Sequence, residues 1–131
     1  MKISLLLLGL IITIVLLSGC AEPLVIDTCE SPGSTFKVTN QNLNEQGWAI
    51  TVSNISGQSL SGLDTTSKTE PLVQNETVLI QPTTVLAGET FRITTSGAYS
   101  KDKLFITIFN VSYTTADGFN VQTTIRCSGK A

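Results

Sequence analysis

The side chains best able to do chemistry in this 131-residue chain are its three cysteines, Cys20, Cys29 and Cys127. A thiol can accept a lipid, bind a metal, attack a substrate or close a disulfide, depending on its surroundings and compartment. Metal binding is disfavoured, because the chain has no histidine and Cys29 lies 98 positions from Cys127. The role of each thiol must therefore be inferred from its place in the chain.

Cys20 follows an apolar run that has the form of an export signal. Lys2 and the amino terminus are positive, and the segment 3–17 is uncharged and rich in Leu and Ile. A short basic start followed by about 7–15 apolar residues is typical of a secretory signal. Glu22-Pro23 follows almost at once and ends any helix. The amino-terminal segment therefore predicts export from the cytoplasm.

The sequence Leu-Ser-Gly-Cys at positions 17–20 resembles the lipobox of prokaryotic lipoproteins. In that family the leader is cut just before the cysteine, and lipid attached to the cysteine anchors the protein. The resemblance implies that 1–19 is a lipoprotein signal peptide and that Cys20 carries membrane lipid. It places the mature chain on the outer face of the cytoplasmic membrane or in the cell envelope of a bacterium or an archaeon. Two or more acyl chains anchor a protein stably, whereas one holds it only marginally.

Three other interpretations of the leader stay open, and the first is ordinary secretion without a lipid. A membrane-spanning helix needs about 20 apolar residues; the segment 3–17 is shorter, although counting on to Ala21 approaches the lower limit. A filament or surface-layer subunit would keep the hydrophobic run as an assembly helix. A pilin-type leader is disfavoured, because such leaders usually carry a charged cleavage site before the run.

Assigning Cys20 to lipid leaves Cys29 and Cys127 near the two ends of the mature chain. In an oxidising compartment, two remaining cysteines usually pair. A disulfide between them would close a loop that contains nearly the whole domain, and chain entropy then predicts about 4–5 kcal/mol of stabilisation. We therefore predict a structural disulfide between Cys29 and Cys127.

The remaining side chains offer little to an enzyme. The lack of histidine removes histidine-based triads and the usual general base. Asp102 and Asp117 would act as a glycosidase pair only if the fold brought them together. A dyad at Ser100-Lys101 would need the two neighbours to point the same way. We predict a protein that is not an enzyme and needs no cofactor, with an envelope enzyme of unrecognised site as the alternative. Arg92 and Tyr99 are interpreted as a solvated strand residue and a loop packing residue.

The charge of the mature chain argues against nucleic acid. Cleavage before Cys20 would remove one lysine, which leaves seven basic and ten acidic residues and a formal net charge of −3. Nucleic-acid binding needs a positive footprint, and the basic residues are not clustered. The expected partners are membrane lipid through Cys20 and an unidentified envelope protein or glycan.

Three Asn-x-Ser/Thr sequons begin at Asn54, Asn75 and Asn110. This number is close to chance for a chain so rich in Ser and Thr. Asn54 and Asn75 are expected to be exposed and are the candidate glycosylation sites. Asn110 lies in the middle of an expected strand and is the poorest candidate.

Alternating apolar residues predict an all-β fold after the leader. We expect a tether over 20–33, with 24–26 as a brief edge strand, and a sandwich domain over 34–131. The clearest half-buried strand has Trp48, Ile50 and Val52 on one face, with Trp48 as a core anchor. Other expected strands surround Phe36 and Val38, residues 78–80, and Phe91 and Ile93, and Leu60 and Leu63 mark a further short strand.

The last section of the chain predicts a hairpin that turns at Asp117-Gly118. Its first strand, 104–113, is apolar on both faces, which is typical of a central strand. Polar segments at 40–46 and 64–75 are expected to be a turn and a loop, and Ser128-Gly129 is expected to end the fold. Six to eight short strands at this spacing predict a single small antiparallel β-sandwich.

The strand and turn pattern between Trp48 and Ile108 resembles the immunoglobulin-like accessory domains of prokaryotic surface lipoproteins. The resemblance rests on an apolar strand, Asn-x-Ser-Gly, Leu-x-x-Leu and then Leu-x-Gly-Glu before Phe-x-Ile. It implies an immunoglobulin-like sandwich with a non-catalytic binding or structural role, and it transfers no site residues.

Overall fold

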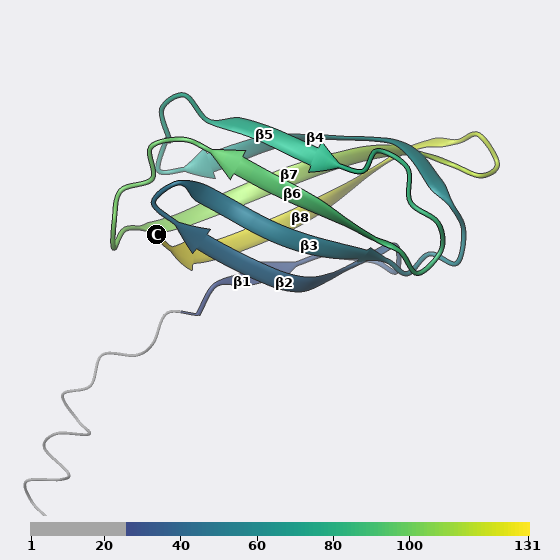
Figure 1. The fold of residues 1–131 in the computed structure, drawn as a ribbon, viewed down its shortest axis with the longest axis horizontal. Helices are drawn as coiled ribbons and strands as arrows, with labels where there is room; N and C mark the ends of the chain where they lie inside the picture. The colour runs from purple at the N-terminus through teal and green to yellow at the C-terminus, as the bar shows by residue number, and fades with distance from the viewer. Residues whose placement is uncertain (1–25) are drawn as a thin grey trace, which may run out of the picture.

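The computed structural model describes residues 26–131, which form a sandwich of two four-stranded sheets (Figure 1). The eight strands are β1 (Thr28–Glu30), β2 (Phe36–Asn44), β3 (Gly47–Asn54), β4 (Leu60–Glu70), β5 (Thr77–Gln81), β6 (Thr90–Ser96), β7 (Leu104–Thr115) and β8 (Asn120–Lys130). Sheet A has the order β1-β8-β7-β4 and sheet B the order β2-β3-β6-β5. The expected signal helix at 1–19 and the residue Cys20 lie outside the described residues.

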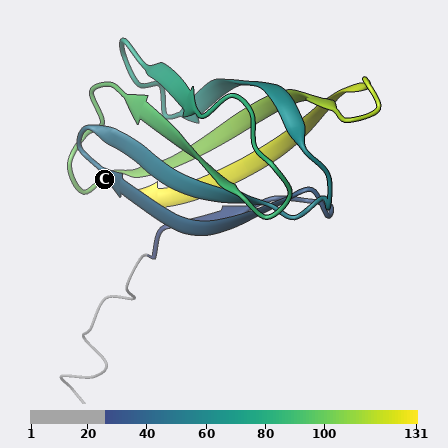
Figure 2. The same ribbon diagram turned by 45° about the vertical axis from the view of Figure 1, so that its right-hand side comes forward.

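Every pairing between the strands is antiparallel. The orders β2-β3-β6-β5 and β8-β7-β4 reproduce the two sheets of a seven-stranded immunoglobulin-type sandwich, and β1 adds an edge strand beside β8. Figure 2 shows the two layers from a second direction. The prediction of an all-β antiparallel sandwich is confirmed.

The core lies between the inner faces of the two sheets. In β3, Trp48, Ile50 and Val52 are all buried, as the alternation predicted. The strand β7 lies between β8 and β4, so its prediction as a central strand is also confirmed. Its inward residues Phe105 and Phe109 are buried, while the apolar residues of its other face remain partly exposed.

The prediction of a loop over 64–75 is wrong for its first half. The strand β4 continues to Glu70, and it looks polar because threonines occupy its inward positions; Thr65 and Thr69 are buried. A bulge between Ser61 and Asp64 also shifts the register with β7, which hides the period of two. Threonine is β-branched and suits a strand, so its presence was a usable signal.

The other expected boundaries need three corrections. The strand β1 pairs with β8, so this part of the expected 20–33 tether belongs to the sandwich. The strand β2 extends to Asn44 through a bulge between Val38 and Asn40, which replaces most of the expected turn at 40–46. The strand β8 continues to Lys130, past the expected end at Ser128-Gly129. The strand β1 is held by β8, about 100 positions away, which local pattern does not reveal.

Candidate functional site

The structure joins Cys29 to Cys127 through a disulfide, as cysteine parity predicted. The two residues are directly opposed in the register of β1 and β8, and their Cα atoms are 4.0 Å apart. Cys127 is fully buried, so the bridge lies against the core. A disulfide held in this way is a structural cross-link.

Asp27 fastens the entering chain to both sheets. Its Oδ2 accepts a hydrogen bond from the backbone N–H of Leu43 at 2.8 Å, and its Oδ1 accepts one from that of Lys130 at 3.2 Å. Its carbonyl oxygen accepts a third from the Gln41 side chain. Because Leu43 lies in β2 and Lys130 in β8, one carboxylate bridges the two layers beside the disulfide.

A polar network around Glu76 connects the sheets on the opposite side of the sandwich. The Glu76 carboxylate accepts hydrogen bonds from the hydroxyls of Ser67 (2.5 Å), Thr69 (3.0 Å) and Tyr99 (2.7 Å). The Thr69 hydroxyl lies 2.8 Å from that of Thr107. Glu76 is the last residue of the connection between β4 in sheet A and β5 in sheet B. Its carboxylate therefore fastens that connection to the core.

The same network reaches the indole of Trp48. The indole N–H donates to Thr107 Oγ1 at 2.9 Å, and the Trp48 backbone N–H donates to Thr95 Oγ1 at 2.7 Å. The Thr95 hydroxyl is 3.0 Å from that of Tyr99. The sequence did not point to this network, because no regular spacing relates its members. Its hydroxyls and carboxylate are occupied by one another, which is the arrangement of a structural brace.

Burial raises the pKa of Tyr99 from 10.0 to about 12. The hydrogen bond and the negative charge of Glu76 act in the same direction, while the hydrogen bond to Thr95 acts against them. Tyr99 is 3% exposed and therefore packs inside the domain, as the interpretation of a packing residue expected. Its phenol stays protonated well above neutral pH.

The expectation that Asn54 is exposed is wrong. Asn54 is fully buried, and its side-chain amide donates to the carbonyl oxygens of Gln58 and Leu86. Its Oδ1 accepts from the backbone N–H and hydroxyl of Ser56. In the folded domain Asn54 is thus a turn brace with no free amide for a glycan. Asn75 is exposed in a turn with φ 57°, and Asn110 is exposed on β7.

The fold does not assemble the catalytic arrangements considered above. Asp102 lies next to the last residue of the chain, where its N–H donates to the Ala131 carbonyl, whereas Asp117 lies in the β7–β8 turn at the other end of β7. Ser100 and Lys101 are both exposed in the loop before β7. Arg92 is exposed on β6, facing solvent beside Leu79.

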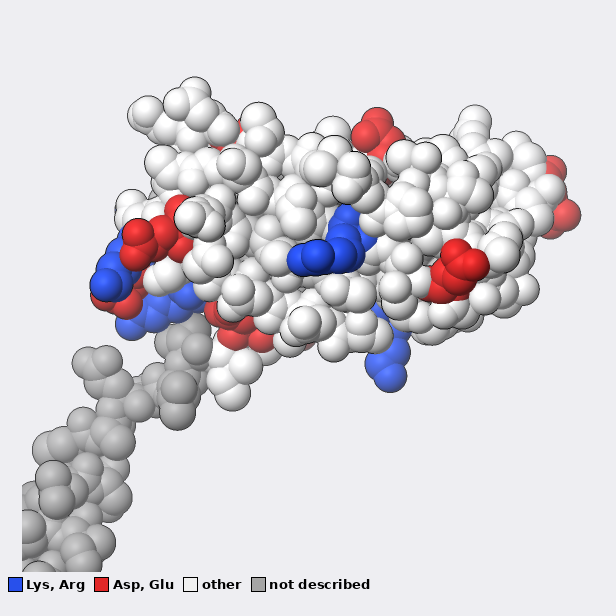
Figure 3. Space-filling view, in the orientation of Figure 1, with Lys and Arg blue, Asp and Glu red and all other residues white. Residues whose placement is uncertain are grey.

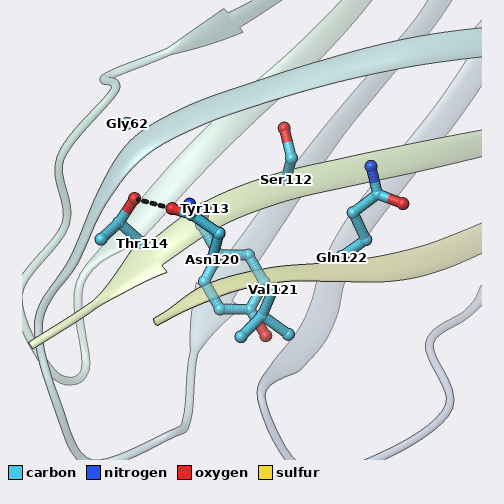
Figure 4. A pocket seen from close by; sticks show the side chains of 7 residues that line it. All are labelled: Gly62, Ser112, Tyr113, Thr114, Asn120, Val121 and Gln122. Carbon is cyan, nitrogen blue, oxygen red and sulfur yellow. Dashed lines mark hydrogen bonds between the residues drawn. The ribbon is translucent and has the colours of Figure 1, made fainter. Parts of the chain in front are cut away.

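The outer face of sheet A has two contrasting halves. Near the β7–β8 turn lies a hollow of about 550 Å³ (Figure 4), lined by Gly62, Ser112, Tyr113, Thr114, Asn120, Val121 and Gln122. Thr114 donates to Asn120 across the two strands at 2.9 Å. The lining is uncharged and offers amides and hydroxyls, which suit hydrogen bonds to a neutral polar ligand. Towards the other end of β7, Leu104, Ile106 and Ile108 are exposed among charged side chains of β8 and β4.

Charged side chains are sparse on the face shown in Figure 3 and gather at the end where the C terminus lies. Blue and red side chains are mixed there rather than separated. Among residues 26–131, no group of three or more His, Cys, Asp or Glu side chains is placed to hold a metal ion. That part of the chain also contains no helix long and apolar enough to cross a membrane.

No family model and no curated protein matches the chain. Among solved structures, the chain is similar to the GAE domain of GGA2p from Saccharomyces cerevisiae, with a TM-score of 0.48 and 11% sequence identity. The match covers 79% of this chain and 96% of that one. A likeness at this score carries no functional argument.

Proposed function

We propose that the chain is a lipid-anchored extracytoplasmic protein whose sandwich has a non-catalytic binding or structural role in the cell envelope. The lipobox-like sequence at 17–20 carries the proposal. The disulfide between Cys29 and Cys127 supports it, because such bridges persist in oxidising compartments. The proposal assigns each of the three cysteines a role.

The way the chain enters the sandwich is also consistent with an anchor at its amino-terminal end. Asp27 and Cys29 lie only seven and nine positions after Cys20, and both are fastened to β8. A pull on Cys20 would therefore be transmitted to a cross-linked strand rather than peel the edge strand β1 away. This arrangement is suited to a folded domain held at a membrane by its amino-terminal end.

The surfaces support binding better than catalysis. The Glu76 carboxylate and the Tyr99 phenol are committed to the brace between the sheets. The uncharged hollow beside Gly62 suits hydrogen bonding to a glycan or to polar groups of a partner protein. Recognition without chemistry is the role that these groups serve best.

The anchor is tested by the substitution Cys20→Ser in the full chain expressed in a bacterial host with a lipoprotein pathway. We expect the wild type in the membrane fraction with an N-terminal peptide that begins at a lipid-modified Cys20. The variant should lose the lipid mass and accumulate unprocessed or released. The matched control is the Cys29→Ser, Cys127→Ser double variant, which should keep the lipid. An intact, unmodified leader in the wild-type mature protein would instead support a retained assembly helix.

A further inference from the structure

Three exposed apolar side chains follow one another along the outer face of β7, and a fourth, Ile26, lies on the other side of β8 where the chain enters the sandwich. Leu104, Ile106 and Ile108 are 57%, 40% and 40% exposed on the outer face of β7, and Ile26 is 71% exposed. We call these four residues the tether-side patch. Single exposed apolar residues are normal on a protein surface, whereas a contiguous group marks a contact.

The register shows that Ile26 belongs to this group. Leu104 is paired with Lys130, and the Lys130 N–H donates to the carboxylate of Asp27, the residue after Ile26. Along this segment Asp27 and Cys29 point inward while Ile26, Thr28 and Glu30 are exposed. Ile26 therefore lies on the same outer face as Leu104, one strand away across β8.

The length of chain before the patch limits what can cover it. Six residue steps separate Cys20 from Ile26, which span at most about 20 Å when extended. The strand β7 has 12 residues and is about 40 Å long, so its two ends differ greatly in their distance from an anchor at Cys20. The patch lies at the near end, whereas the hollow beside Gly62 lies at the far end.

The charges beside the patch suit a membrane surface. Lys130 and Arg126 are the register partners of Leu104 and Ile108 on β8, and Lys68 is the partner of Ile108 on β4. Lys103 directly precedes Leu104. Long basic side chains can lie along apolar surface with their charges at lipid headgroups. Glu70 and Glu30 lie on the same face, next to the second and third rows of the patch.

We propose that the tether-side patch rests on the bilayer that holds Cys20, so that sheet A is inclined towards the membrane. This inference depends on the proposed lipid anchor. Ile26 and Leu104 enter the headgroup region first, and Ile106 and Ile108 follow along β7. The loops at 55–59, 82–89 and 116–119 then face away from the membrane, where a partner can reach them.

The test uses the lipidated full chain in vesicles of phosphatidylcholine and phosphatidylglycerol. The substitution Leu104→Cys supplies a thiol for an environment-sensitive dye, because Cys20 is acylated and the other two cysteines are bonded. The matched control is Leu79→Cys, which replaces a similarly exposed leucine on β5 of sheet B. Quenching by a lipid with a nitroxide near its headgroup should be several-fold stronger at position 104. A second variant, Ile106→Cys, should behave like Leu104→Cys.

Each result separates this inference from the anchor on which it rests. Equal, weak quenching at positions 104 and 79 in vesicle-bound protein would overturn the docked orientation while leaving the anchor intact. Efficient energy transfer between labelled copies at position 104, with no lipid quenching, would assign the patch to a second copy and also overturn it. Failure of the unsubstituted protein to carry lipid or bind vesicles would contradict the proposed anchor itself.

Discussion

Trp48 fills the space between the sheets and holds polar partners on both. Its indole N–H donates to Thr107 in sheet A, while its backbone N–H donates to Thr95 in sheet B. We expect Trp48→Ala to cost about 3–5 kcal/mol of the free energy of unfolding, because a large cavity replaces the ring. Trp48→Phe keeps most of the apolar volume and should cost clearly less. Chemical denaturation measures both, and an unchanged midpoint for Trp48→Ala would contradict the core role.

Tyr99 predicts a specific loss of stability in alkali. Its pKa in the folded protein is raised to about 12, so the unfolded chain releases the proton first as the pH rises. The contribution of Tyr99 is therefore complete below about pH 10 and is lost as the pH rises towards 12. We expect the denaturation midpoint of the wild type to fall in this window more than that of Tyr99→Phe. Tyr113→Phe is the matched control and should keep the wild-type fall; identical profiles for wild type and Tyr99→Phe would rule the effect out.

At the scale of elements, the backbone of β8 at Gly129 packs closely against Trp48 and Asp27. A Cβ on Gly129 would meet Trp48 Cη2 at 2.9 Å and would collide with the Asp27 carboxylate. We expect Gly129→Ala to destabilise the domain and to loosen β1, because Asp27 also bonds Lys130 and Leu43. Thermal unfolding and amide exchange at Leu43 would measure the two effects. The neighbouring substitution Ser128→Ala is the control and should have little effect. Equal stability of the two variants would contradict the prediction, because it would show that β8 can shift to accommodate the added methyl group.

At the scale of the whole molecule, the disulfide closes a loop with a sequence separation of 98. Replacing Cys29 and Cys127 by serine should lower the free energy of unfolding by about 4–5 kcal/mol if the effect arises from chain entropy. Denaturant titration of the double variant against the oxidised wild type gives the difference. The reduced wild type should match the double variant. Local loosening of β1 in the double variant, with no loss in the global free energy of unfolding, would argue against the entropic account.

The sequence predicts the disulfide, whereas the hydrogen-bonded side chains that brace the two sheets depend on the tertiary structure. The disulfide could be predicted because two cysteines remain after Cys20 is assigned to lipid, and two cysteines in an oxidising compartment usually pair. The bracing roles of Asp27 and Glu76 could not be predicted, since each carboxylate meets groups from strands distant in sequence. Asn54 was misjudged for the same reason, because its buried amide bonds Leu86, 32 positions away.

The sequence by itself predicted the antiparallel class and the buried face of β3, because these depend on composition and on a local period of two. Only the tertiary structure showed that β4 continues to Glu70, since its later inward positions carry threonines whose burial depends on packing against the other sheet. Only it placed Ile26 and Leu104 on the same outer face, on either side of β8. Local periodicity shows which side of a strand is apolar, whereas the stacking and register of strands decide which distant residues meet.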